Sequence, residues 1–299
     1  MADLTPLIEG SSQIEEGKRR GRKICGCKTL KEEFEGSYFD LVEQQGSEDG
    51  SDTRTLDVAS TFSPKPLLPY LVAKLIILAW MISVMAMSIS GNKFPSFWLA
   101  FLTHWTLVLT VAYSFMSFVA SVILACRPPH KATLSIWLKI MWTLYAAMLP
   151  ANVLVTILYW ALEFDASTFQ PYLGIMLHGG TMILIGIDGC IISRIPLRIK
   201  QFWFYELFCF IYIIWTIIHS FSSIGNPFNE SRGEDDNSIY PQLDWKDNTV
   251  TAIITSVLVL LVANPIIFIL CRLLSRCLSR RYEDTTSRSP NEYFVDEGV

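Results

Sequence analysis

Apolar residues are gathered in long runs between two polar ends of the chain. Residues 1–66 and 276–299 are rich in charged and polar side chains, whereas six stretches between them carry almost no charge. A helix rises about 1.5 Å per residue, so a stretch near 20 residues can cross the roughly 30 Å of hydrocarbon in a bilayer. The pattern therefore predicts six membrane-spanning helices, over residues 67–90, 96–125, 134–161, 172–192, 201–221 and 249–274.

Composition agrees with this pattern and sets the fold class. Of the 299 residues, 51% are hydrophobic and only 17% are charged, whereas soluble domains carry about 25% charged residues. We therefore predict an all-α fold, a polytopic six-helix transmembrane bundle over residues 67–275, flanked by disordered cytosolic tails over residues 1–66 and 276–299. The net charge of −4 is scattered along the chain, so no nucleic-acid-binding surface is indicated.

Basic residues between the predicted helices indicate the orientation in the membrane. Nineteen Lys and Arg residues lie in the two tails and in the second and fourth connections, against three in the other connections. Because cytosolic loops carry the excess of Lys and Arg, both termini are predicted to lie in the cytosol. The protein itself is predicted to lie in the plasma membrane or an endomembrane. The glycosylation motif at Asn229 then falls on the outer or lumenal side. Lys74 and Lys139 lie near cytosolic helix ends, where we expect their side chains to reach the lipid headgroups.

Six hydroxyl residues follow one face of the second predicted helix. They recur at steps of three and four residues, the period of a helix face, so this stripe is predicted to face the protein interior. Helix packing through small residues explains such a stripe without any chemistry, each hydroxyl bonding to its own backbone. The six residues are Thr103, Thr106, Thr110, Ser114, Ser117 and Ser121.

The fourth predicted helix places an imidazole on its polar face. That face carries Gly174, His178, Thr181 and Asp188. Ionisable residues within a membrane indicate function, although a structurally satisfied core histidine is the alternative. Thr103 and His178 each lie about seven residues from the outer ends of their predicted helices, roughly 10 Å deep. A hydroxyl level with an imidazole is the minimum geometry for a base-activated nucleophile that attacks an ester.

Several carboxylates are candidates for the acid that orients the histidine. Asp188 lies ten residues from His178 on the same helix, about 15 Å away, which is too far for a hydrogen bond. Asp244, in the outer loop before the sixth helix, is the preferred candidate, with a loop turn as its structural alternative. Glu163 and Asp165, in the third connection, lie on the same side of the membrane and remain open.

Two further histidines are expected to lie elsewhere. His104 follows Thr103 but projects about 100° away on a helix, so it is predicted to line another surface. His219, at the outer end of the fifth predicted helix, is placed at the membrane interface.

Motifs of several other protein classes are absent from the sequence. It contains no Gly-x-Ser-x-Gly elbow, Walker loop, His-Glu-x-x-His or Cys-x-x-Cys motif, so soluble hydrolase, NTPase and zinc chemistry are not indicated and no cofactor is predicted. The sequence shows no evident internal repeat and no basic residue at the mid-depth of a predicted span, and these are the features that would indicate a transporter. Asp188 and Glu206 are the only hints of a polar path toward the cytosol.

Four short motifs follow one another across the predicted helices. They are Phe101-Leu102-Thr103-His104-Trp105, Leu177-His178-Gly179-Gly180, Ser193-Arg194-Ile195-Pro196-Leu197-Arg198 and Ile239-Tyr240-Pro241-Gln242-Leu243-Asp244-Trp245. Together they resemble the rolling stone family over about residues 67–275. That family is distantly similar to androgen-induced multipass proteins that hydrolyse fatty acid esters of hydroxy fatty acids. The resemblance implies a threonine hydrolase, whose Thr and His correspond by motif position to Thr103 and His178.

Two classes of function therefore follow from the sequence. The first is an intramembrane lipid ester hydrolase with Thr103 as nucleophile, His178 as base and Asp244 as orienting acid. Its partners would be membrane lipids, including a fatty acid ester substrate. The alternative is a non-enzymatic membrane protein acting in cell fusion, adhesion or scaffolding, since rolling stone itself is associated with myoblast fusion and has no assigned chemistry. No protein partner is indicated.

Overall fold

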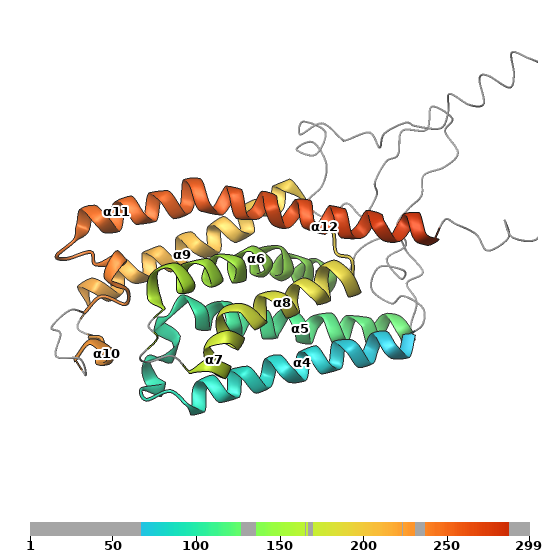
Figure 1. Cartoon of the computed structure of the whole chain (residues 1–299), viewed down its shortest axis with the longest axis horizontal. Coiled ribbons are helices and arrows are strands. Elements are labelled where there is room, and N and C mark those ends of the chain that lie inside the picture. The colour runs from blue at the N-terminus through green and yellow to red at the C-terminus, as the bar shows by residue number, and fades with distance from the viewer. Residues whose placement is uncertain are drawn as a thin grey trace, which may run out of the picture.

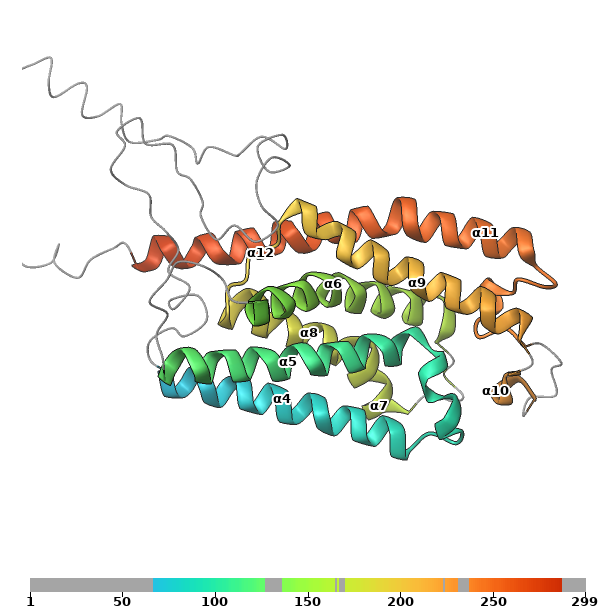
Figure 2. The same ribbon diagram turned by 180° about the vertical axis from the view of Figure 1, so that it is seen from behind.

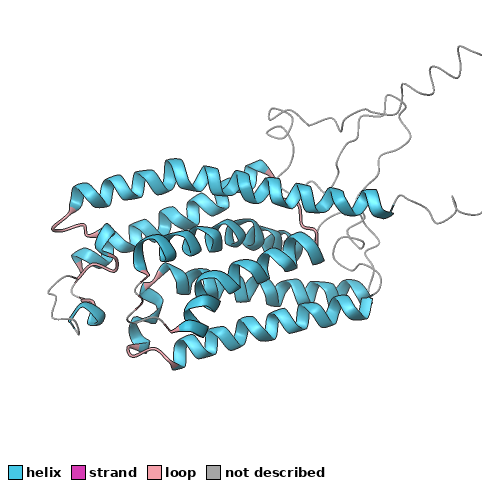
Figure 3. Ribbon diagram, viewed as in Figure 1, coloured by secondary structure: helices cyan, strands magenta, loops and turns pink. Residues whose placement is uncertain are grey.

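The regular structure of the described residues is helical. The structure is a computed structural model, and it describes residues 67–126, 136–164, 166, 170–222, 224–230 and 237–286. Within these residues there is no strand, so the predicted all-α fold is confirmed (Figure 3). The predicted N-terminal tail, residues 1–66, lies outside the described residues, as do residues 287–299 of the predicted C-terminal tail.

In the part of the chain that the structure describes, six helical spans lie side by side as an elongated bundle (Figures 1 and 2). They are long and apolar enough to cross a membrane, which confirms the predicted number, and they run over Leu67–Ser90, Leu102–Cys126, Ile136–Glu163, Pro171–Ile192, Ile199–Phe221 and Thr249–Leu278. The start of α4 (Leu67–Ser90) and the end of α12 (Asn264–Thr286) lie at the same end of the bundle, as an even number of spans requires (Figure 1). Helix α12 ends at Thr286, so it continues past residue 276, where the C-terminal tail was predicted to begin.

Several spans combine α-helix with short π-helical turns, each of which inserts one extra residue and rotates the faces that follow. The third span joins α6 (Ile136–Leu158) to the π-helical η2 (Tyr159–Glu163). The fourth joins α7 (Pro171–Ile175) and α8 (Thr181–Gly186) to the π-helical η3 (Met176–Gly180) and η4 (Ile187–Ile192). The sixth joins α11 (Thr249–Leu258) to α12 through the π-helical η7 (Val259–Ala263). The fifth span instead joins a 3-10 helix, η5 (Ile199–Gln201), to α9 (Phe202–Phe221). In the sixth span η7 ends two residues before Pro265, which has no backbone N–H to donate to the preceding turn.

The second span begins later than the sequence indicated. Residues 96–100 belong to η1 (Pro95–Ala100), a 3-10 helix, and Phe101 after it is extended, with φ −88° and ψ 140°. Helix α5 (Leu102–Cys126) starts only after this break. The predicted start at residue 96 is therefore wrong, and Thr103 lies in the first turn of α5. The same end of the bundle carries the short helices α10 (Pro227–Glu230) and η6 (Pro241–Leu243) (Figure 1).

Helix α6 lies at the centre of the bundle, in contact with α5, α8, α9 and α12. Its Trp142 and Tyr145 are fully buried. The Trp142 indole N–H donates to the Pro196 carbonyl oxygen at 2.9 Å, and the Tyr145 hydroxyl lies 3.1 Å from Cys190 Sγ. Each of these polar atoms is thereby satisfied inside an apolar core. The outer faces of the spans carry exposed apolar side chains such as Leu68 and Leu261, as a surface in contact with lipid requires.

The hydroxyl stripe of α5 faces the interior, as predicted, and all six of its residues are buried. Thr106 and Ser121 donate to carbonyl oxygens of their own helix, at 2.8 Å each. Thr110 instead accepts a hydrogen bond from Asn152 of α6 at 2.9 Å, and Ser117 donates to Asp188 of η4 at 3.1 Å. The stripe therefore combines local backbone bonding with bonds between helices.

Lys74 does not reach toward the headgroups, so the expectation for this residue is wrong. Its side chain is 2% exposed, and its Nζ lies 2.9 Å from Oδ1 of Asp188 and donates to Ser193 Oγ at 2.6 Å. Ser117 Oγ accepts a further hydrogen bond from the same ammonium group. The physical reason is that the packing of α4 against α5 and η4 brings a carboxylate within reach of the ammonium, and an unpaired Asp188 would be costly in the same low dielectric.

Candidate functional site

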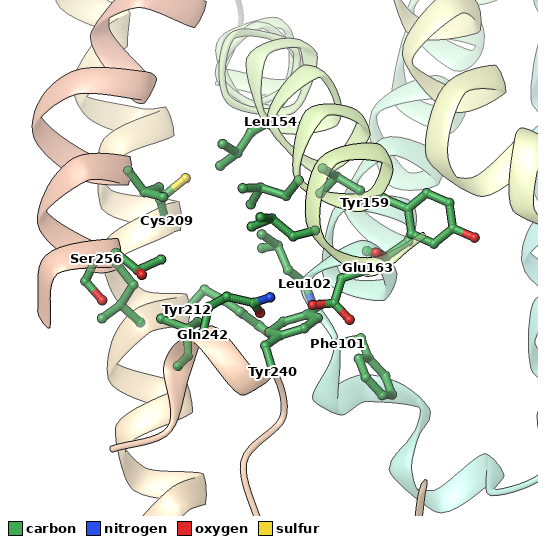
Figure 4. A pocket seen from close by; sticks show the side chains of 18 of the residues that line it. Phe101, Leu102, Leu154, Tyr159, Glu163, Cys209, Tyr212, Tyr240, Gln242 and Ser256 are labelled. Carbon is green, nitrogen blue, oxygen red and sulfur yellow. The ribbon is translucent and has the colours of Figure 1, made fainter. Parts of the chain in front are cut away.

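A cavity of about 320 Å³ opens at the end of the bundle that carries η1 and η6 (Figure 4). Its walls come from the start of α5, the end of α6 with η2, η3, α9, the segment around η6, and α11 with η7. Its side chains are mostly apolar and aromatic, with a few polar groups, which is typical of a small-molecule binding site. The lining residues are Phe101, Leu102, Thr103, His104, Leu154, Val155, Leu158, Tyr159, Leu162, Glu163, His178, Cys209, Tyr212, Ile213, Tyr240, Gln242, Leu243, Thr255, Ser256 and Val259.

Thr103 and His178 both line this cavity. Thr103 reaches it from the first turn of α5 and His178 from the π-helical turn η3. Among the described residues no direct hydrogen bond joins the two side chains. The structure therefore brings the predicted nucleophile and base to one cavity without a hydrogen bond between them, and catalytic hydrogen bonds often tighten only when substrate binds.

His178 is held by its ring face, and one of its nitrogens lacks a partner. The imidazole stacks on the Tyr159 ring, with 3.5 Å between centroids and 5° between planes. Its Nδ1 is buried and makes no hydrogen bond, although buried polar atoms are nearly always paired. The backbone carbonyl of His178 accepts a hydrogen bond from the Trp160 indole at 3.2 Å. The ring is thus positioned by stacking, while its buried Nδ1 makes no hydrogen bond.

His104 also lines the cavity, so the expectation that it faces another surface is wrong. The ring stacks on Trp98 at 4.2 Å, and its Nδ1 bonds to the Trp98 carbonyl oxygen. Its Nε2 lies 3.2 Å from Ser88 Oγ, which in turn accepts a hydrogen bond from the Trp98 indole at 2.9 Å. Both ring nitrogens of His104 are therefore engaged, which suits a structural role better than that of a general base.

The Tyr240 side chain lines the cavity beside Thr103, although Tyr240 was not among the site residues predicted from the sequence. Its hydroxyl accepts a hydrogen bond from the Leu102 backbone N–H at 3.3 Å. Burial raises the pKa of Tyr240 above its usual range, while hydrogen bonds with Tyr212 and Thr103 oppose that rise. The hydroxyl therefore stays protonated at neutral pH, next to the candidate nucleophile. Tyr240 belongs to the motif at 239–245, which was the only signal pointing to it.

Two aromatic side chains of α9 hold the end of η1 by hydrogen bonds. The Tyr212 hydroxyl and the Trp215 indole both donate to the carbonyl oxygen of Ala100, at 2.9 Å and 3.3 Å. Two helix-borne donors thus anchor the residues directly before Thr103. The position of Thr103 is consequently tied to α9 and to the loop before α11.

Asp244 does not line the cavity, and His178 is not among its hydrogen-bond partners. Its buried carboxylate accepts hydrogen bonds from the backbone N–H groups of Lys246 and Asp247, at 3.0 Å each. Such bonds stabilise a turn, here directly before α11. Glu163 does line the cavity, at the end of η2, whereas Asp165 lies outside the described residues.

His219 and Glu206 lie away from the cavity. His219 is fully buried near the end of α9, with its ring 5.4 Å from that of Phe97 and 5.8 Å from that of Trp215. The Glu206 carboxylate accepts a hydrogen bond from Asn264 at 3.0 Å, and Asp188 is paired with Lys74 inside the bundle. Neither carboxylate extends the cavity toward the other end of the bundle. In the part of the chain that the structure describes, no cluster of His, Cys, Asp and Glu could hold a metal ion.

Comparison with known proteins places the chain in a family. The family described as Protein rolling stone matches residues 67–290. Protein rolling stone of Drosophila melanogaster is 26% identical over 121 residues, a match that covers 40% of this chain and 42% of that protein. No solved structure matches the chain. Because the family match includes all six spans and every residue that lines the cavity, the chain belongs to the rolling stone family.

Proposed function

We propose that this protein is an integral membrane hydrolase of lipid esters. The observation that carries the proposal is that the Thr103 hydroxyl and an imidazole with an unpartnered nitrogen, His178, line one largely apolar cavity. A cavity with such walls suits an acyl chain, and the two side chains supply the groups that ester hydrolysis needs.

In the proposed reaction Thr103 is the nucleophile and His178 the general base. His178 takes the hydroxyl proton as Thr103 Oγ1 attacks the ester carbonyl carbon, forming a tetrahedral intermediate. The intermediate collapses as the bond to the alcohol oxygen breaks, and that oxygen takes the proton from His178. Water, deprotonated in turn by His178, then attacks the acyl-threonine ester. A fatty acid is released and the proton returns to Thr103.

Two further residues, Tyr240 and Asp244, are proposed to position Thr103 and the neighbouring loop without contacting the substrate. Tyr240 places a protonated hydroxyl beside Thr103 and a hydrogen-bond acceptor beside the N–H of Leu102. Asp244 bonds the backbone of the turn that follows η6. We propose that Asp244 supports catalysis by holding the loop that carries Tyr240, in place of orienting the imidazole directly.

The proposed site opens to the outer or lumenal leaflet. The cavity is lined by the start of α5 and by α11. These segments lie toward the end of the bundle opposite the start of α4 and the end of α12 (Figures 1 and 2). If both termini lie in the cytosol, as the distribution of Lys and Arg predicts, a substrate would enter from the membrane lipids of the outer or lumenal side.

The test is activity of the purified full-length protein in detergent. Wild type, Thr103→Ala and His178→Ala would be incubated with branched fatty ester lipids and with a fluorophosphonate probe that labels activated hydroxyl groups. Wild type should release fatty acid and take up the label, and each variant should lose both. The matched control is Thr106→Ala, because Thr106 lies on the same helix face, donates to its own helix and does not line the cavity.

The control should keep wild-type turnover and labelling. Folding of every variant would be checked by size-exclusion chromatography and thermal unfolding. A well-folded wild-type protein that takes up no label and hydrolyses none of the esters would contradict the hydrolase proposal. The non-enzymatic role in fusion, adhesion or scaffolding would then remain.

A further inference from the structure

The wall of the cavity formed by η6 and α11 carries uncharged polar side chains. The short helix η6 packs against α11, and together they contribute Gln242, Thr255 and Ser256 to the lining. Hydroxyl and amide groups both donate and accept hydrogen bonds without carrying a charge. The proposed reaction uses none of the three, so this wall is free to recognise a part of the substrate other than the ester carbonyl.

Ser256 differs from many hydroxyl residues of the spans. Several of those donate to the carbonyl oxygen four residues earlier in their own helix, as Ser121, Thr156 and Thr181 do. Ser256 is only 7% exposed, yet its buried Oγ makes no hydrogen bond to the described residues. A buried hydroxyl without a partner is costly and uncommon. Because Ser256 lines the cavity, a bound ligand can supply the missing partner.

Gln242 brings a second polar group to the same wall. Its side-chain amide lines the cavity and makes no hydrogen bond to any described residue. Gln242 follows Tyr240 by two residues, and Figure 4 shows its side chain directed into the cavity. Tyr240 in turn lies beside Thr103. The polar wall therefore begins close to the place where the ester carbonyl is proposed to bind.

The size of the cavity and its lining narrow the choice of ligand. A volume of about 320 Å³ is near the small end of ligand cavities, which run from about 300 to 1,000 Å³, so it suits an ester with one acyl chain. No Lys or Arg is among the described residues that line it, and these side chains are the usual partners of phosphate groups. Free hydroxyl groups close to the ester fit this wall better than a phosphate does.

We propose that Gln242 and Ser256 make the cavity selective for single-chain acyl esters of polyols, in which free hydroxyl groups lie a few bonds from the ester oxygen. The inference rests on the proposed function, because it assigns the class of substrate to the same site. A glycerol ester with one acyl chain is the simplest such substrate. Its acyl chain lies against the apolar walls, and its free hydroxyl groups bond to Ser256 Oγ and to the Gln242 amide.

The test uses three esters of oleic acid that differ only in the alcohol. They are 1-oleoylglycerol, propyl oleate, which lacks the free hydroxyl groups, and 1-oleoylglycerol 3-phosphate. In purified full-length wild type, kcat/KM should be about 3- to 10-fold higher for the glycerol ester than for the propyl ester, the size expected of uncharged hydrogen bonds. The phosphate should be the poorest substrate, and a phosphate hydrolysed best would overturn the choice of an uncharged polyol.

The variants are Ser256→Ala and Gln242→Met, which remove the polar groups of the wall. Each should lower kcat/KM for the glycerol ester by about 2- to 10-fold and leave the value for propyl oleate unchanged. Ratios between variants on one substrate cancel differences in how the esters partition into detergent. Variants that keep the wild-type preference for the glycerol ester would overturn the proposal.

The matched control is Thr251→Ala. Thr251 lies on α11 five residues before Ser256, is exposed and does not line the cavity, so this variant should keep the wild-type order of the esters. Ser256→Ala should unfold at no lower temperature than wild type, because the hydroxyl it removes makes no hydrogen bond to the described residues. A clear loss of stability would mean that this hydroxyl has a structural partner, which contradicts its role in selectivity.

Binding of the matching non-hydrolysable ethers separates this inference from the proposed function. The protein can hydrolyse none of the esters and still bind the oleyl ether of glycerol more tightly than oleyl propyl ether, with a difference that Ser256→Ala removes. That result keeps the selectivity while the hydrolase proposal fails. An active wild type that hydrolyses the glycerol and propyl esters equally well, and binds both ethers alike, would overturn the selectivity and leave the hydrolase intact.

Discussion

Nζ of Lys74 lies 2.9 Å from Oδ1 of Asp188, and both side chains are only 2% exposed. The two residues are 114 positions apart in the sequence, so the pair joins the first span to the fourth. Ser117 donates to the second carboxylate oxygen and connects α5 to the same pair. A charge pair satisfied in this way couples three helices far from the candidate site.

Removing one member of the pair should destabilise the bundle strongly. Lys74→Met leaves Asp188 buried without its cation, and Asp188→Leu does the reverse, so each should cost about 3–5 kcal/mol. Thermal unfolding in detergent, followed by size-exclusion chromatography, measures the loss. The double variant Lys74→Met, Asp188→Leu removes both charges and should recover most of the stability. Single variants as stable as wild type would contradict the assignment.

Gly189 should tolerate no side chain. A Cβ atom added there would overlap the ring of Tyr145, which is fully buried at the centre of the bundle. Because the ring has no room to move, Gly189→Ala should lower the stability by about 1–3 kcal/mol or more. Gly186→Ala is the control, since its nearest atom would be Leu149 Cδ1 at 3.9 Å, an ordinary contact. The melting temperatures of the two variants give the comparison, and equal values would disprove the prediction.

Tyr240→Phe should lower turnover more than substrate affinity. The change removes the hydroxyl that accepts the Leu102 N–H and lies beside Thr103, but it keeps the ring that lines the cavity. If the proposed hydrolase is correct, kcat should fall about 10- to 100-fold, by analogy with the loss of other groups that position a nucleophile, and KM should change little. Steady-state kinetics on one ester measure both constants. Unchanged kcat would remove Tyr240 from the proposed mechanism.

The same hydroxyl predicts a pH dependence of stability. The pKa of Tyr240 is raised in the folded protein, whereas an unfolded tyrosine ionises near pH 10. The contribution of the neutral hydroxyl is therefore complete below about pH 10 and is lost as the pH rises above it. Unfolding measured between pH 9 and pH 11 should show a shallower fall in Tyr240→Phe than in wild type. Parallel profiles would mean that Tyr240 ionises equally in both states.

The orientation of the bundle can be measured by cysteine labelling. Cys277 is exposed on α12, and Lys246 is exposed at the opposite end of the bundle, between η6 and α11. Each position is tested as the sole cysteine of a variant whose other cysteines are replaced by serine, because Cys126 is exposed as well as Cys277. In cells whose plasma membrane alone is permeabilised, an impermeant maleimide should label Cys277 and leave Lys246→Cys unlabelled if that residue faces a lumen. At the plasma membrane of intact cells the pattern should be the reverse. Labelling of Lys246→Cys from the cytosol would invert the predicted topology.

The sequence determined the number of spans, the all-helical fold and the buried hydroxyl face of α5. Each of these follows from the cost of placing polar groups in hydrocarbon, which is a property of residues close together in the chain and can be read from hydropathy and period. It also pointed to Thr103 and His178, which line one cavity. Tertiary structure decided the rest. The pairing of Lys74 with Asp188, the engaged nitrogens of His104 and the placement of Tyr240 beside Thr103 depend on which helix faces meet, and no local pattern encodes contacts between segments that are distant in the chain.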